Sequence, residues 1–166
     1  TAMEADEAEQ EAREELLEET LNKPAVVVVA RQHPGEVVGS WVMSGFIRFL
    51  MGPSAEATSL RDRFCFHIVP MVNVDGVIHG NSRCTLVGAD PNRCWQNPNP
   101  VIHPEVHALR RYLSRTHQRS GVELFIDLHG HSQRTSAFFY GCRPEHVRSA
   151  LFPKLASLAT RDVDFE

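Results

Sequence analysis

Hydrophobic positions along this chain alternate between a strand pattern and a helical pattern from residue 24 onward. Apolar runs rich in β-branched or aromatic residues predict four strands, at 25–30, 64–72, 122–128 and 136–142. Between and after them, helices are predicted over 37–51, 104–117 and 144–160. Strands that alternate with helices predict a layered α/β domain with a largely parallel sheet. A long stretch at about 73–102, rich in Gly, Asn and Pro, is expected to be irregular.

The first 22 residues differ from the rest of the chain. Residues 1–20 hold nine acidic side chains and one basic one, Arg13, although the net charge of the whole chain is only -4. A like-charge block of this kind is typical of a solvated helix or a disordered tail. We therefore predict an acidic tail or linker over 1–22, and a folded domain over 24–166.

Composition excludes several classes of protein. The longest apolar run, 25–30, is far shorter than the ~18 residues of a membrane span, and the acidic N-terminus does not have the order of a secretory signal. The four scattered cysteines form no C-x-x-C pair, which favours free thiols. We expect a cytoplasmic protein that has neither a membrane nor a nucleic acid as partner.

Candidate chemistry follows the predicted strands, at the ends where function collects in such sheets. His33 and Glu36 lie three apart on a tight turn, and His129 ends the strand at 122–128. Two imidazoles and a carboxylate are a ligand set of catalytic zinc, which keeps one position for water. Taken singly, His33 is better explained as a surface histidine on a turn, and a partly buried, hydrogen-bonded histidine is a common explanation of His129.

The irregular stretch adds groups that suit an anionic substrate. Arg93 with its neighbour Asn92 can bind a carboxylate, and the separate Arg83 can stabilise an oxyanion. Asp90 can accept the free N–H of a zinc-bound histidine. Each of these residues alone is better explained as an exposed loop residue.

Six motifs in order, HPGE, PMVNVDGV, GNSRC, DPNRCW, DLHGHS and FFYGC, run from about residue 24 to 142. As a set they resemble the cytosolic carboxypeptidase branch of the zinc metallocarboxypeptidases. The resemblance implies a three-layer α/β/α fold with a mixed, largely parallel sheet, incomplete at the C-terminus of this chain. It also implies one Zn²⁺ per chain, bound by His33, Glu36 and His129.

Further roles follow from the same resemblance, residue by residue. Asn92 and Arg93 match the pair that holds the terminal carboxylate of the substrate, and Arg83 matches the arginine that polarises the scissile carbonyl. Asp90 matches the carboxylate that supports the first zinc histidine. His131 does not match a ligand, and we interpret it as lining the pocket.

The activity that the resemblance implies is removal of C-terminal residues, glutamate above all, from acidic protein tails such as those of tubulin. Asn-Val-Asp-Gly and Asp-Pro-Asn-Arg depart from the usual family motifs but keep their functional side chains. The general-base glutamate of the family follows the third ligand at a distance, and Glu123, Glu145 and Glu166 do not match it. We therefore expect little activity from these 166 residues alone.

Two alternatives stay open. A deacylase that acts on N-acyl amino acids uses a similar H-x-x-E and histidine site, and a fragment without the base would be a non-catalytic module that binds zinc and peptide. The turn at Asn73 and the Asn92–Arg93 pair favour the peptidase.

Overall fold

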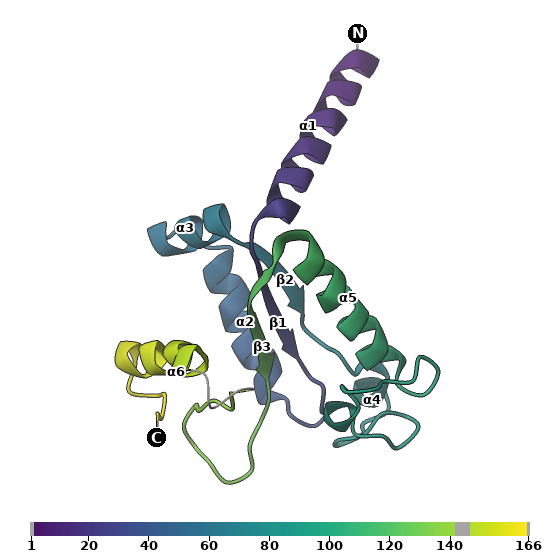
Figure 1. Ribbon diagram of the computed structural model, residues 1–166, viewed down its shortest axis with the longest axis vertical. Coiled ribbons are helices and arrows are strands. Elements are labelled where there is room, and N and C mark those ends of the chain that lie inside the picture. Colours follow the sequence, from purple (N-terminus) through teal and green to yellow (C-terminus); the bar gives the residue numbers. More distant parts are fainter. Residues whose placement is uncertain (1, 142–146, 166) are drawn as a thin grey trace. The chain divides into compact units, whose positions relative to one another are not determined.

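A three-stranded parallel sheet forms the centre of the compact unit that ends at Gly130 (Figure 1). The structure is a computed structural model that describes residues 2–141 and 147–165. Its strands are β1 (Ala25–Ala30), β2 (Cys65–Val69) and β3 (Val122–Leu128), in the order β2-β1-β3. Both pairings are parallel, which confirms the predicted α/β class, although no antiparallel strand joins this sheet within the described residues.

The side chains of β1 alternate between two apolar cores, because successive residues of a strand point to opposite faces of a sheet. One face packs against Leu109 and Leu113 of α5 (Pro104–Ser120), and the other against Met43 and Phe46 of α2 (Val38–Leu50). Every residue of β1 is buried. A helix therefore covers each face of the sheet, which gives the three layers expected.

The acidic N-terminal segment forms a helix, α1 (Ala2–Asn22), the first of the two forms expected for it. Its last turns contact α5, where Glu18 pairs with Arg119 at 2.7 Å between Oε1 and Nη2. Such an exposed ion pair stabilises by ~1 kcal/mol at most.

Two short helices were not predicted. Helix α3 (Ala55–Arg63) begins at Ser54, whose hydroxyl accepts a hydrogen bond from the Ala57 amide, and α4 (Val74–Ile78) lies inside the stretch expected to be irregular. A 3₁₀ turn, η1 (Pro91–Arg93), lies in the same stretch. Each of these elements buries only one residue. Their sequences therefore show little of the hydrophobic periodicity from which a helix is predicted.

The strand predicted at 136–142 is wrong for residues 136–141, where only Ala137 forms a bridge, with Val163. The aromatic run makes ring contacts instead: Phe138 packs on Tyr140, and Phe139 on Phe152 of α6 (Val147–Ala159). Residues from His131 onward form a second compact unit, separate from the one that ends at Gly130. The first three residues of the helix predicted at 144–160 lie outside the described residues, and so do Cys142 and Glu145.

In the described part of the chain, no helix has the length and apolar character needed to cross a membrane. There, Cys65, Cys84 and Cys94 are free thiols.

A close contact at Gly76 supports the turn that carries His33. The Asn73 side chain is buried, accepts a hydrogen bond from the Gly76 amide at 3.0 Å and donates one to the Gln32 carbonyl. A Cβ on Gly76 would lie 2.6 Å from both Asn73 Oδ1 and Pro34 Cγ. Only glycine fits this position without displacing the turn.

Gly76→Ala should therefore lower the free energy of unfolding by about 1–3 kcal/mol, the usual cost of overpacking. Gly45→Ala is the matched control, because Gly45 lies inside α2 with no heavy atom near its missing Cβ. The control should gain up to ~1 kcal/mol from the higher helix propensity of alanine. Chemical denaturation of both variants measures the difference, and equal stabilities would contradict the packing argument.

Candidate metal centre

Strand pairing brings the two candidate histidines together. Ala30 at the end of β1 lies opposite Leu128 at the end of β3. His33 lies three residues after the end of β1, and His129 follows β3 directly. Because β1 and β3 are parallel neighbours, both side chains lie at the same edge of the sheet.

The turn that carries His33 and Glu36 is held by backbone hydrogen bonds and by one arginine. Arg31 has a positive φ of 59°, a conformation uncommon outside glycine. Its guanidinium donates to the Pro34 carbonyl from Nε at 3.1 Å and from Nη2 at 2.7 Å, and to Ser40 Oγ from Nη1 at 2.8 Å. The Gly35 amide donates to the Ser82 carbonyl at 2.8 Å. The turn is thus fixed before any ligand binds.

Three side chains converge on one point. His33 Nδ1 lies 2.7 Å from Glu36 Oε1, His129 Nδ1 lies 3.0 Å from Glu36 Oε2, and the two Nδ1 atoms are 3.2 Å apart. Atoms that share a tetrahedral zinc at ~2.0–2.1 Å are separated by ~3.3 Å. The donor set and its spacing fit Zn²⁺, so these are the residues that would hold it.

The outer nitrogens of both imidazoles face carboxylates. His33 Nε2 lies 3.0 Å from Asp90 Oδ1, and His129 Nε2 lies 2.7 Å from Asp127 Oδ2. A carboxylate accepts the proton of Nε2, which leaves the Nδ1 lone pair directed at the metal position. The arrangement thus selects the tautomer of each histidine that a metal ion requires.

Electrostatics favour a charged cluster. Burial raises the pKa of Glu36. The hydrogen bond from the Gly130 amide and the proximity of His33 and His129 lower it by more, so the pKa lies below its usual value. The hydrogen bond to Asp127 raises the pKa of His129 despite partial burial. A proton therefore competes with a cation for His129.

Of the remaining predicted residues, Arg83 is linked to this cluster through Asp90. Arg83 donates to Asp90 Oδ2 from Nε at 2.8 Å and from Nη2 at 2.7 Å, and its side chain is about half exposed (48%). Arg93 is exposed and donates to the Asn92 carbonyl at 3.3 Å. His131 belongs to the second unit, where its Nδ1 accepts from the Gln133 and Arg134 amides. Their assigned roles stay predictions.

Three residues near the cluster carried no predicted role: Arg31, Gln32 and Asp127. Asp127 had a detectable signal, because residues two apart in a strand share a face, so that Asp127 and His129 at the end of β3 point the same way. For Arg31 and Gln32, the only signal in the sequence was their position next to His33. Sequence alone does not reveal what they contact.

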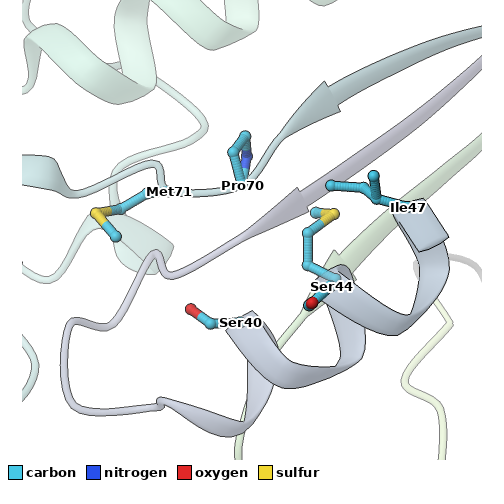
Figure 2. Close-up of a pocket in the computed structure, with 6 residues that line it drawn as sticks. Ser40, Ser44, Ile47, Pro70 and Met71 are labelled. Carbon is cyan, nitrogen blue, oxygen red and sulfur yellow. The ribbon is translucent and has the colours of Figure 1, made fainter.

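A separate hollow of about 270 Å³ lies between α2 and the segment after β2 (Figure 2). Ser40, Ser44 and Ile47 line it from the helix, and Pro70 and Met71 line it from the other side. It contains none of the candidate ligands. We therefore assign the chemistry to the histidine cluster.

Asp127→Asn should lower the pKa of His129 in the metal-free protein, because the carboxylate is the main cause of the upward shift. A raised folded pKa stabilises the fold below about pH 6.5, and this stabilisation is lost as the pH rises through the folded value. The variant should lose stability chiefly on the acidic side. NMR titration of His129 measures the pKa directly, with the exposed Asp62→Asn as control, and an unchanged value would contradict the assignment.

Comparison with known proteins gives the same family from sequence and from structure. The family model for zinc carboxypeptidases matches residues 3–163. Cytosolic carboxypeptidase 1 of Xenopus laevis is 50% identical over 124 residues, and that of Danio rerio is 42% identical over 146. These alignments cover 73% and 86% of this chain. The chain spans only 10% and 12% of the length of these two relatives.

Solved structures agree. A metallo-carboxypeptidase from Burkholderia cenocepacia is 33% identical with a TM-score of 0.77, over 87% of this chain and 40% of that one. A metallo-carboxypeptidase from Pseudomonas aeruginosa, in complex with (2-guanidinoethylmercapto)succinic acid, is 31% identical with a TM-score of 0.77 over the same shares. The chain belongs to the zinc carboxypeptidase family.

Proposed function

We propose that this chain forms part of a zinc metallocarboxypeptidase that removes residues from the C-termini of proteins. The observation that carries the proposal is the convergence of His33, Glu36 and His129 on one point. The outer nitrogen of each imidazole also lies within hydrogen-bond distance of a carboxylate. Membership of the zinc carboxypeptidase family supports the same reaction. Bound zinc would polarise the scissile carbonyl and make water a stronger nucleophile.

The protein groups divide the remaining work. Arg93, exposed beside Asn92, would bind the terminal carboxylate of the peptide and so select free C-termini. Arg83 would stabilise the negative charge that develops on the carbonyl oxygen. The ion pair between Arg83 and Asp90 supports this role, because the same Asp90 carboxylate also contacts His33 and so keeps the Arg83 guanidinium close to the candidate ligands.

The proposed substrates are acidic protein tails, with glutamate as the residue removed and tubulin tails as examples. The resemblance carries this proposal, and the charge balance is compatible with it. Outside residues 1–20 the chain holds 17 − 1 = 16 basic and 21 − 9 = 12 acidic residues, a net of +4. The relatives are named cytosolic carboxypeptidases, which supports a cytoplasmic location for this chain.

The Asn92–Arg93 pair favours the peptidase over a deacylase. Glutamate release from a polyglutamylated peptide, compared with turnover of an N-acyl amino acid, separates the two. Peptide binding without turnover would instead select the non-catalytic module. That these 166 residues alone lack the general base stays a prediction, which the same assay tests.

His129→Ala should abolish stoichiometric zinc binding, because the variant retains only two of the three ligands. His131→Ala is the matched control, since His131 lies two residues away in the sequence and is not a proposed ligand. Metal analysis after dialysis against a weak chelator measures both. Equal zinc content in His129→Ala and the parent would refute the ligand assignment.

In the complete enzyme, Arg93→Ala should chiefly raise KM, because it removes binding that substrate and transition state share. Arg83→Ala should chiefly lower kcat, by roughly 10²–10³-fold, as measured for one oxyanion donor elsewhere. Steady-state kinetics on a peptide with a free C-terminus give both constants. An Arg83→Ala variant changed only in KM would mean that the two roles are wrongly assigned.

A further inference from the structure

A continuous line of hydrogen bonds links the loop after η1 to His129. The indole N–H of Trp95 donates to Gln32 Oε1 at 3.0 Å. The amide nitrogen of Gln32 donates to Asp127 Oδ2, which also accepts from His129 Nε2 at 2.7 Å. Four side chains from three distant parts of the sequence thus form one line.

The direction of this line is fixed by chemistry. An indole nitrogen can only donate, and an ionised carboxylate can only accept. Gln32 between them must therefore present its oxygen to Trp95 and its nitrogen to Asp127, so the alternative amide orientation would break both bonds. Gln32 is almost completely buried, 1% exposed, which leaves it little access to water as a substitute partner.

Asp127 depends on this line for its own position. Its second oxygen, Oδ1, is buried without a hydrogen-bond partner among the described residues. Both bonds that orient the carboxylate are therefore made by Oδ2, one with Gln32 and one with His129. Without Gln32, His129 would remain the only hydrogen-bonded neighbour of Asp127 among those residues.

The segment 90–95 reaches both histidines. At its start, Asp90 Oδ1 faces His33 Nε2 at 3.0 Å. At its end, Trp95 reaches His129 through Gln32 and Asp127. The same six residues contain Asn92 and Arg93, the proposed carboxylate-binding pair.

We propose that Gln32 and Trp95 are positioning residues for His129, and that segment 90–95 holds both histidines at metal-binding distance. This inference rests on the proposed zinc site. It assigns no contact with substrate to either residue. It makes the loop that would bind the substrate carboxylate part of the support of the metal centre.

A simpler role for Trp95 is packing. Its ring lies against the core on one face of the sheet and makes an edge contact with Phe125, at 6.1 Å between ring centroids. Packing depends on the ring, whereas positioning depends on the indole N–H. Variants that remove one and keep the other separate the two roles.

The test measures zinc affinity in the full chain by competition with a chromophoric chelator at fixed pH. Gln32→Met keeps the volume but removes the bond to Asp127, and should weaken zinc binding about 10- to 100-fold, the usual effect of losing such support. Trp95→Phe keeps an aromatic ring but removes the N–H, and should weaken it about 3- to 10-fold. The double variant should bind no worse than Gln32→Met alone, because both changes break the same line.

Phe125→Leu is the control, because it changes the packing of Trp95 and leaves the line intact. Its zinc affinity should stay within about twofold of the parent. Affinities of Gln32→Met and Trp95→Phe within the same range would overturn the proposal, as would an equal loss in Phe125→Leu and Trp95→Phe. A parent chain that binds no zinc through His129 would overturn the proposed function as well, so the two failures are distinguishable.

Discussion

The parallel pairing of β1 with β3 is the constraint on which the whole site depends. It sets Ala30 opposite Leu128, and so delivers His33 and His129 to one edge of the sheet although 96 positions separate them in sequence. The pairing is stabilised by burial, since β1 packs against apolar side chains on both faces. A shift of register by one residue would turn the side chains of β3 to the opposite faces. His129 would then no longer face His33 and Glu36, and Asp127 would no longer face Gln32.

The cluster is costly without a cation. Glu36, Asp90 and Asp127 surround one buried and one partly buried imidazole. Although partial burial opposes the charge of Glu36 and Asp90, the hydrogen bonds that they accept hold the pKa of both carboxyls below its usual value. Concentrating three carboxylates in this way disfavours folding unless positive charge compensates them. In the metal-free chain, Arg83 and the raised pKa of His129 provide part of that charge. A divalent ion would provide more, which couples metal binding to the stability of the strand ends.

Sequence patterns predict those features whose signal is local. The strands at β1 and β3 follow from long apolar runs, and the place of His33 and His129 follows from where those runs end. The short helix α3 escapes because it buries only Ala57. The run predicted as a strand at 136–142 has a strand composition, but its described residues, 136–141, make ring contacts instead of a strand ladder. A strand-like composition is therefore not sufficient, because a segment forms a strand only where it can pair and pack with a neighbouring strand.

Support around the metal position is the part that sequence does not reveal. Gln32 meets Asp127 across 95 positions and Trp95 across 63, and no periodicity links residues so far apart. Asp90 is different, because the resemblance assigns it a role and the structure lays it against His33. Long-range hydrogen bonds of this kind require coordinates.

Zinc K-edge X-ray absorption of the zinc-loaded full chain tests the central claim most directly. The account predicts two imidazoles, one carboxylate and at most one further light ligand, all at ~2.0–2.2 Å. Cys94 offers a plausible competitor, since its thiol lies beside Asp90 with Sγ 3.2 Å from the Asp90 carbonyl oxygen. A zinc–sulfur distance of ~2.3 Å in the spectrum would contradict the account.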